Sequence, residues 1–387
     1  MSSLSKLKTT AQVFNPAVSV APLGIIAMDG AKELGNRIND YLVMWAKQSG
    51  QDVDTFLIPC SCPRFQSGDA KALIQKTVRG YDLFIVCDTG NYSCTYPLFG
   101  HTNHMSPDDH YQDLKRIIQA AGGKAHRINV IMPVLYGGRQ HRRNYRESLD
   151  CAMMLQELQS IGVSNLLTFD AHDPRVQNAV PLMGFDNIIP SYQVLKALFK
   201  AFSDLHVDKN HFMVVSPDEG AMGRNMYYAS AMEVDLGMFY KRRDYATIIN
   251  GRNPIVAHEY LGNNVKNMDI FIADDIIASG ESMLDIAYEL KKRDAKKIIA
   301  YATYCLFTSG FQKLDEAYKS GIIDGVFGTN LTYIPDELKS REWFHIVDCS
   351  KYVSYFVAAL NHDMSISEIL DPHEKIRTLL DSHSVTA

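Results

Sequence analysis

The chain has 387 residues, of which 46% are hydrophobic and 21% are charged. This globular composition excludes a largely disordered chain, and the length favours two domains. The 39 basic and 44 acidic residues give a net charge of −5, and no block of like charge indicates a nucleic-acid-binding arm or a membrane-surface helix. We therefore expect no nucleic-acid partner.

The first twenty residues, MSSLSKLKTTAQVFNPAVSV, are polar and weakly periodic, and we interpret residues 1–20 as a loosely held extension. They lack the apolar region and cleavage pattern of a signal peptide, and no apolar run approaches the ~18 residues of a membrane-spanning helix. The seven cysteines are scattered, and the close pair Cys60 and Cys62 has no matching ligands downstream. These observations predict a cytoplasmic protein with reduced thiols and no membrane partner.

Short apolar runs alternate with amphipathic segments along the chain. The runs expected to form strands are residues 82–88, 128–136, 165–171, 212–218, 268–275 and 297–304. Runs of this kind suit strands that are buried on both faces. Residues 106–123 predict a helix that Ser106 caps and Gly122-Gly123 ends. A second predicted helix, over residues 282–297, has one apolar face made of Met283, Leu284, Ile286, Ala287 and Leu290.

The alternation of strands and helices predicts an α/β fold with parallel sheets covered by helices on both sides. A turn-rich stretch, GFDNIIPS, precedes a new helical pattern and places the best domain boundary near Pro190. We expect a first domain over residues 21–190 and a second over residues 191–344. Residues 345–387 are expected to form a C-terminal helix and tail that pack back on the first domain.

The segment MDIFIADDIIASGESM (residues 268–283) carries the most chemical information. It predicts a strand ending in Asp274-Asp275, a loop of small residues and then a helix. The ends of parallel strands bind ligands in open α/β sheets, and a helix start suits a phosphate. Two adjacent acids can accept hydrogen bonds from vicinal hydroxyls, so the segment is complementary to a ribose 5-phosphate. Taken alone, it also fits a strand with solvated acids and an ordinary capped turn.

This segment resembles the phosphoribosyl-diphosphate fingerprint of phosphoribosyltransferases and ribose-phosphate pyrophosphokinases. Further motifs resemble the pyrophosphokinases and follow their order: RFQSGDAK (64–71), YGGRQHRR (136–143), TFDAHDPRVQ (168–177), VVSPDEGAMGR (214–224) and YKRRDY (240–245). The resemblance covers roughly residues 55–372. It implies two phosphoribosyltransferase-like domains, each a mainly parallel sheet flanked by helices, with the ATP side in the first and the ribose-phosphate loop in the second.

The resemblance implies transfer of a pyrophosphoryl group from Mg-ATP to the anomeric hydroxyl of ribose 5-phosphate. Charge on the transferred group must be neutralised by Mg²⁺ and fixed cations. The matching positions imply catalytic roles for Lys241 and Arg243 and metal ligation by His172 and Asp218, although Mg²⁺ prefers oxygen to imidazole. ATP binding is implied for Phe65, Asp69, Arg139, Gln140 and His141. Ribose-phosphate binding is implied for Asp274, Asp275, Ala278, Ser279, Gly280, Glu281 and Ser282.

Phe65 and Asp69 resemble the family's adenine-side pair, which reaches the ATP site of a neighbouring subunit. The resemblance therefore implies a homo-oligomer built on dimers, with a hexamer as the family precedent.

The ribose-phosphate loop departs from the family pattern Asp-Asp-x-x-Asp-Thr-x-Gly-Thr. Ala278 replaces the third acid, and Glu281 stands where the family has glycine, so its charge would repel a phosphate if it pointed inward. Ser67 and His141 also replace acids of the ATP-side motifs. These changes leave open a larger acceptor that contains ribose 5-phosphate, such as ADP-ribose.

Two further alternatives also stay open. The chain could be a non-catalytic regulatory subunit of such an enzyme, although it retains Lys241, Arg243, His172 and Asp218. It could instead be a phosphoribosyltransferase, a class that does not need the motifs at residues 64–71, 136–143 and 240–245.

Overall fold

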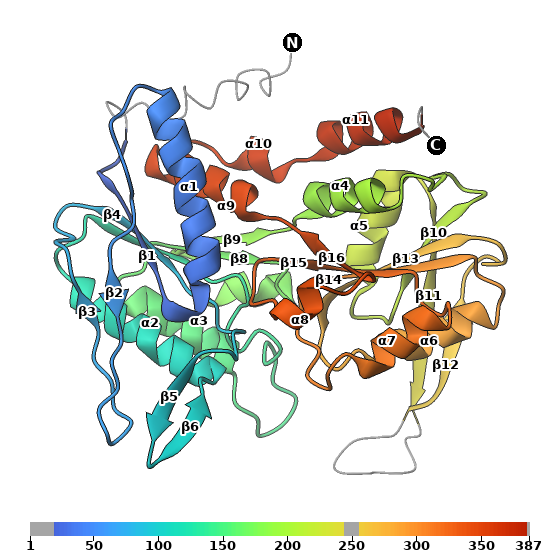
Figure 1. The fold of residues 1–387 in the computed structure, drawn as a ribbon, viewed down its shortest axis with the longest axis horizontal. Helices are drawn as coiled ribbons and strands as arrows, with labels where there is room; N and C mark the ends of the chain where they lie inside the picture. Colours follow the sequence, from blue (N-terminus) through green and yellow to red (C-terminus); the bar gives the residue numbers. More distant parts are fainter. Residues whose placement is uncertain (1–18, 244–254, 385–387) are drawn as a thin grey trace. The chain divides into compact units, whose positions relative to one another are not determined.

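The computed structural model describes residues 19–243 and 255–384, with the side chains of residues 241–243, 255–258 and 384 outside the description. The chain forms two compact units (Figure 1). The first contains the described residues up to Pro190 together with residues 330–333 and 348–371. The second contains the described residues of 191–329, 334–347 and 372–387.

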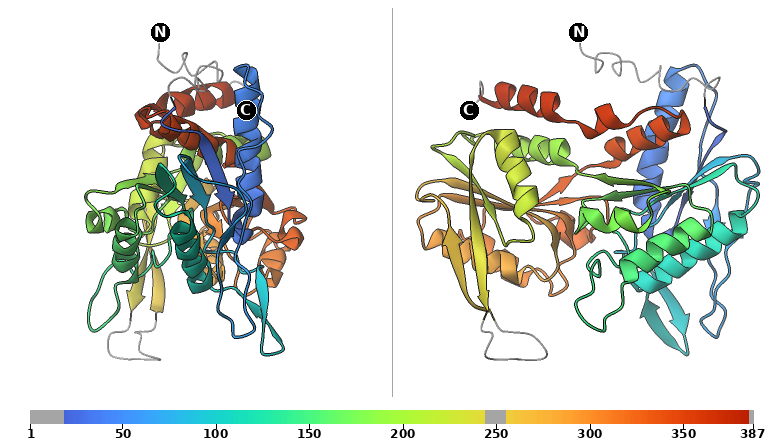
Figure 2. Two further views of the ribbon diagram at one scale, coloured as in Figure 1. Left: turned by 90° about the vertical axis from the view of Figure 1, so that its left-hand side faces the viewer. Right: turned by 180° about the vertical axis from the view of Figure 1, so that it is seen from behind.

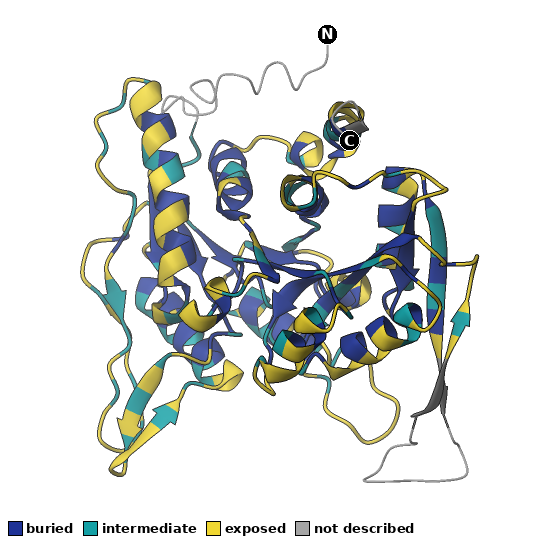
Figure 3. Ribbon diagram, turned by 45° about the vertical axis from the view of Figure 1, so that its right-hand side comes forward, coloured by how far each residue is buried: buried dark blue, intermediate teal, exposed yellow. Residues whose placement is uncertain are grey.

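The first unit is built on a five-stranded parallel sheet within its described residues, in the order β1-β4-β7-β8-β9. Its strands are β1 (Leu23–Ala27), β4 (Asp82–Val86), β7 (Arg127–Ile131), β8 (Asn165–Phe169) and β9 (Gly184–Ile188). All five residues of β4 are buried, as expected for a central strand covered on both faces (Figure 3).

Helices cover both faces of this sheet (Figure 2). On one face, α1 (Lys32–Gln48) packs against β1 and α9 (Ser350–Asn361), and the rings of Trp45 and Tyr355 stack at 4.8 Å. On the other face, α2 (Pro107–Ala121) and α3 (Asp150–Ser160) share one apolar core with alternate residues of β4, β7 and β8. The unit also contains η4 (Asp29–Ala31), η5 (Pro174–Ala179) and α10 (Ser367–Leu370).

Two small antiparallel hairpins belong to the first unit. They are formed by β2 (Cys60–Ser61) with β3 (Leu73–Ile74) and by β5 (Thr95–Leu98) with β6 (His101–His104). The β5-β6 hairpin is largely exposed (Figure 3). Only Cys60 and Ile74 of these hairpins pack against the central core, so the loops around them can hold side chains at the surface.

The second unit contains a seven-stranded sheet in the order β12-β11-β10-β13-β14-β15-β16 among its described residues. Its pairs are parallel except for β11 with β12. The strands are β10 (Phe212–Ser216), β11 (Asp235–Arg243), β12 (Ile255–Leu261), β13 (Asp269–Ile277), β14 (Lys297–Cys305), β15 (Gly325–Thr329) and β16 (Phe344–Val347).

Helices also cover both faces of the second sheet. One face shares a core with α6 (Glu281–Lys291), α7 (Gln312–Lys319) and α8 (Asp336–Lys339). On the other face, α5 (Met222–Met232) packs on β10 and β13, α4 (Ser191–Ala201) packs on β16, and α11 (His373–Ser384) packs on α4 and α5. Alternation along β13 explains this, because Ile270 and Ile272 join the first core while Phe271 contacts Tyr228 of α5.

The predicted α/β class of mainly parallel sheets flanked by helices is confirmed. Ser106 caps α2 through a hydrogen bond from the Asp109 N–H, and α2 ends before Gly122 as predicted. The helix predicted over residues 282–297 ends earlier, at Lys291, because the chain turns at Asp294 with a φ of 61°. The structure also divides the predicted C-terminal segment 345–387: α9 and α10 belong to the first unit, but β16 and α11 belong to the second.

Candidate functional site

The carboxyl end of β13 carries two adjacent acids inside a mostly buried strand. Asp274 and Asp275 lie within the strand and not at its end, because pairing with β14 continues to Ile277. Asp275 is buried and Asp274 is half-buried. Burial, and then the neighbouring charge of Asp275, raises the pKa of Asp274 well above its usual range. The two carboxyl groups therefore titrate as a pair that retains a proton more readily than a solvated acid does.

Arg224 of α5 lies beside both acids. Its Nη1 is 3.6 Å from Asp274 Oδ1, and its Nη2 is 3.9 Å from Asp275 Oδ1. The guanidinium lowers the pKa of Asp274 and so partly opposes the effect of burial. Arg224 is the last residue of the VVSPDEGAMGR motif, and no role for it was predicted from the sequence.

Residues 278–282 turn the chain from β13 into α6. Gly280 has a φ of 86°, a left-handed conformation that favours glycine, and α6 starts at the next residue. The Ala278 carbonyl accepts the Thr308 N–H at 2.8 Å, and the Ser279 hydroxyl accepts the Glu281 N–H at 3.4 Å. Ser282 is exposed in the first turn of α6. The helix start and the nearby hydroxyls form an arrangement that suits a phosphate.

Glu281 does not leave an uncompensated charge on this turn. Its exposed carboxylate forms an ion pair with Lys313 of α7, and that ammonium group lowers the pKa of Glu281. Repulsion of a phosphate was expected only if Glu281 pointed inward. That condition is therefore not met. The sequence gave no signal for this partner, because the two residues are 32 positions apart.

Asp218 follows β10 at the same end of the second sheet. Its Oδ1 accepts the Ala221 N–H at 3.1 Å, and its backbone carbonyl accepts the Ser216 hydroxyl at 2.8 Å. The half-buried carboxylate is a hard oxygen ligand of the kind that Mg²⁺ prefers. Within the described part of the chain, no three His, Cys, Asp or Glu side chains gather as a ready-made metal site.

The first unit places His172 near His141. The two rings are 5.3 Å apart, and His141 Nε2 is 3.5 Å from Asp173 Oδ2. Asp173 also accepts hydrogen bonds from the backbone and guanidinium of Arg175, which lower its pKa to about 2. Partial burial lowers the pKa of His141, in spite of the neighbouring Asp173. His141 therefore favours the neutral imidazole.

Arg139 and Gln140 lie in the loop that follows β7. Arg139 is exposed, whereas the Gln140 amide donates to the Ser148 carbonyl at 2.9 Å. Gly137, with a φ of 65°, makes the turn that precedes them. Gln140 thus closes its own loop, and Arg139 is presented at the surface.

Phe65 and Asp69 stand on a separate turn between β2 and β3. The Phe65 N–H donates to the Asp69 carbonyl at 2.7 Å, and the Asp69 carboxylate accepts the Ser67 hydroxyl at 2.9 Å. The Phe65 ring is 51% exposed. The turn is therefore internally hydrogen-bonded and displays an aromatic ring.

Lys241 and Arg243 end β11, where their backbones pair with His258 and Ile255 of β12. Their side chains lie outside the described residues, so their predicted catalytic roles stay predictions.

Two family models match successive parts of the chain. Residues 23–162 match the family model for the N-terminal domain of ribose phosphate pyrophosphokinase. Residues 186–324 match the phosphoribosyl transferase domain. The chain belongs to the ribose-phosphate pyrophosphokinase family. The predicted family is therefore confirmed.

Individual relatives of this family match most of the chain. A ribose-phosphate pyrophosphokinase of Vibrio parahaemolyticus is 26% identical over 90% of this chain and 98% of its own length. One of Mycoplasmopsis pulmonis is 28% identical over 79% of this chain and 86% of its own length. The crystal structure of phosphoribosylpyrophosphate synthetase from Mycobacterium smegmatis has a TM-score of 0.71 and 18% identity, and covers 88% of this chain and 99% of that chain. This last likeness supports the fold.

An anchor beneath the Phe65 turn was missed in the sequence. Arg64 donates from Nη1 to Asp113 Oδ1 at 2.7 Å, and both side chains are buried. Arg116 donates to the same oxygen at 2.7 Å, and the Arg64 guanidinium lies 5.0 Å from the Tyr96 ring centre. Arg64 belongs to the quoted RFQSGDAK motif, but its partner lies 49 residues away on α2.

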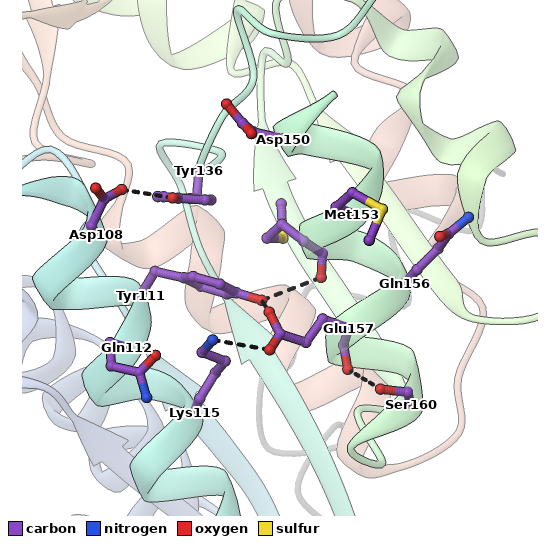
Figure 4. A pocket seen from close by; sticks show the side chains of 11 residues that line it. Asp108, Tyr111, Gln112, Lys115, Tyr136, Asp150, Met153, Gln156, Glu157 and Ser160 are labelled. Carbon is purple, nitrogen blue, oxygen red and sulfur yellow. Dashed lines mark hydrogen bonds and ion pairs between the residues drawn. The ribbon is translucent and has the colours of Figure 1, made fainter. Parts of the chain in front are cut away.

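A groove of about 720 Å³ between α2 and α3 contains none of the predicted site residues (Figure 4). Five of its polar side chains pair with one another. The Tyr136 hydroxyl donates to Asp108 at 2.6 Å, while Glu157 accepts from Tyr111 at 2.7 Å and from Lys115 at 2.9 Å. The strand ends of the second unit therefore remain the stronger candidate site.

Proposed function

We propose that this protein transfers the β,γ-pyrophosphoryl group of Mg-ATP to the anomeric hydroxyl of ribose 5-phosphate, giving phosphoribosyl pyrophosphate and AMP. One observation carries the acceptor half: the acid pair Asp274-Asp275 is followed by the turn at Gly280 and the start of α6. Ribose 5-phosphate carries vicinal hydroxyls at one end and a phosphate at the other. The hydroxyls match the acid pair, and the phosphate matches the turn and the helix start. Family membership supports the donor half.

The acid pair would accept hydrogen bonds from the two ribose hydroxyls. Hydrogen bonds to a charged acceptor are about twice as strong as neutral ones, so fixed carboxylates can orient the sugar. The N–H groups at the start of α6 and the hydroxyls of Ser279 and Ser282 would hold the 5-phosphate. The anomeric hydroxyl then attacks the β-phosphorus and loses its proton to solvent. The bond from the β-phosphorus to the oxygen that bridges to the α-phosphorus breaks, and AMP leaves with that oxygen.

The donor half assigns the nucleotide to Phe65, Asp69, Arg139, Gln140 and His141, with Lys241 and Arg243 neutralising the charge that develops. The exposed Phe65 ring and the exposed Arg139 suit an adenine and a phosphate, respectively. Roles in Mg²⁺ ligation are assigned to Asp218 and to His172, each from its own motif. When bound, this ion would neutralise charge on the phosphate groups.

The larger acceptor is not favoured. It was suggested by Ala278 and Glu281, and the Glu281–Lys313 ion pair removes the main electrostatic reason to prefer a phosphate of lower charge. A regulatory subunit is likewise not favoured.

The exposed Phe65 supports a homo-oligomer based on dimers, in which this ring contacts a neighbouring copy. No helix in the described ranges is long and apolar enough to cross a membrane. We also propose that the protein is cytoplasmic.

AMP release tests the proposed function. The purified protein is incubated with Mg-ATP and either ribose 5-phosphate, ADP-ribose or no acceptor, and AMP is quantified by chromatography. We expect AMP formation that depends on ribose 5-phosphate. Equal or faster turnover of ADP-ribose would reverse the choice of acceptor. If neither acceptor raises AMP formation above the level without acceptor, the proposed reaction is wrong.

A further inference from the structure

Asn225 is a fully buried polar residue on α5 that hydrogen-bonds to the strand carrying the acid pair. Its exposed fraction is 0%. Its Oδ1 accepts the Ala273 N–H at 3.0 Å, and its Nδ2 donates to the Ala273 carbonyl at 2.8 Å. Ala273 immediately precedes Asp274. One side-chain amide therefore holds both backbone polar groups of the residue before the acids.

The course of β13 explains why such a contact is needed. The pairing of β13 with β10 ends at Val214 and Phe271, although β13 continues to Ile277 on its β14 side. In a parallel pair, the N–H and C=O of alternate residues point to the same neighbour. Ala273 is the next such residue after Phe271, but β10 no longer pairs with β13 at this position. Without Asn225, the N–H and C=O groups of Ala273 would therefore lack a hydrogen-bond partner on this side of the strand. The Asn225 amide continues the hydrogen-bond ladder by one step.

The same amide also contacts the loop that carries Asp218. Asn225 Nδ2 lies 2.9 Å from the Ala221 carbonyl and 3.3 Å from Ser216 Oγ. Ser216 Oγ donates to the Asp218 carbonyl, and Asp218 Oδ1 accepts the Ala221 N–H. Asn225 therefore links the backbone before the acid pair to both ends of the Asp218 loop.

We propose that Asn225 is a positioning residue for acceptor recognition, acting through Ala273 on the direction of the Asp274 and Asp275 carboxylates. The inference rests on the proposed function. A misplacement of about 1 Å in a reacting group can lower a rate about a hundredfold, so a backbone anchor directly before two substrate-binding acids can affect catalysis without contacting substrate. An apolar side chain of similar size would fill the space but leave both Ala273 groups unpaired.

The test compares Asn225→Ala with a matched control, Asn129→Ala. Asn129 is also 0% exposed, and its Nδ2 donates to Asp82 at 2.8 Å and to the Leu83 carbonyl at 3.3 Å. It lies on β7 of the other sheet and has no proposed part in the reaction. We expect Asn225→Ala to raise the KM for ribose 5-phosphate about tenfold and to change the KM for ATP much less. Asn129→Ala should lower Tm while both KM values stay at the wild-type level.

A double-mutant cycle separates positioning from general destabilisation. If Asn225 acts through the acids, Asn225→Ala should weaken acceptor use much less in an Asp275→Asn background than in the wild type. Asn225→Asp keeps the side-chain shape and the acceptor for the Ala273 N–H but loses the donors, so it replaces the alanine variant if that variant does not fold. It should show the same selective rise in the KM for ribose 5-phosphate.

The outcomes separate this inference from the function on which it rests. If the wild type forms AMP but Asn225→Ala and Asn225→Asp keep the wild-type KM for ribose 5-phosphate, the positioning role is wrong and the function stands. Equal rises in both KM values, or full additivity with Asp275→Asn, would also overturn it. If the wild type forms no AMP with ribose 5-phosphate, the proposed function and this inference both fail.

Discussion

The strand ends of the second unit and the loops of the first unit hold their polar groups in different ways. Asp274 and Asp275 lie inside a strand whose backbone is fixed by β14 on one side and Asn225 on the other. Phe65 and Arg139 are exposed on loops. Core hydrogen bonds therefore fix the backbone of the acid pair, whereas the geometry of the loops depends on a few anchors at their base. Substitutions in the two regions should consequently differ in their effects on the use of ribose 5-phosphate, on the use of ATP and on stability.

The largest expected effect comes from the acid pair. Asp274→Asn combined with Asp275→Asn should lower kcat/KM for ribose 5-phosphate about a thousandfold, because the hydrogen bonds from the two ribose hydroxyls to the acid pair are weakened. The same change should raise Tm at neutral pH. Burial raises the folded-state pKa of Asp274, so ionising this group costs stability as pH rises from its unfolded pKa toward its folded pKa.

Steady-state kinetics and thermal denaturation at pH 4 to 8 check this prediction. The gain in Tm should shrink toward the acidic end, where the wild-type acid is protonated as well. A double variant that loses Tm at every pH would show that the pair stabilises the fold, and the contrast between the two regions would not hold.

The second effect concerns the anchor of the Phe65 turn. Asp113→Ala should lower the free energy of unfolding by about 3 kcal/mol, since it leaves the buried Arg64 and its neighbour Arg116 without their shared acceptor. It should also raise the KM for ATP and leave the KM for ribose 5-phosphate unchanged. Denaturant unfolding and kinetics measure both, and Phe65→Ala is the control that should affect ATP use without the loss of stability. A rise in the KM for ribose 5-phosphate would contradict the separation of the two regions.

The smallest effect concerns the charge on the turn of residues 278–282, where the phosphate is proposed to bind. Lys313→Ala leaves Glu281 without this partner and should raise the KM for ribose 5-phosphate about threefold at low salt, with a smaller rise at high salt because ions screen the repulsion. Adding Glu281→Gln to Lys313→Ala should restore the wild-type KM.

Lys297→Ala is the matched control, because Lys297 forms an ion pair with Asp204 on the same unit, away from the turn. It should leave the KM unchanged. Failure of Glu281→Gln to rescue Lys313→Ala would mean that Lys313 acts on the substrate by another route.

Much of the fold could be predicted because it depends on local pattern. The apolar runs at residues 82–88 and 268–275 became β4 and most of β13, and Ser106 caps α2 as its spacing indicated. The end of α6 was misplaced because the helical pattern continues past the turn at Asp294. The division of the C-terminal segment between the two units could not be predicted, because the contacts of β16 and α11 are tertiary.

By itself, the sequence determined the order of strands and helices, the family motifs and the acid pair with the turn that follows it, since all of these are encoded in neighbouring residues. Only the tertiary structure decided how these groups are held. Glu281 finds Lys313 across 32 residues, Asn225 finds Ala273 across 48, and Arg64 finds Asp113 across 49. The physical reason is that a charge or a buried amide is satisfied by whatever the fold brings to it, and no local spacing records that partner.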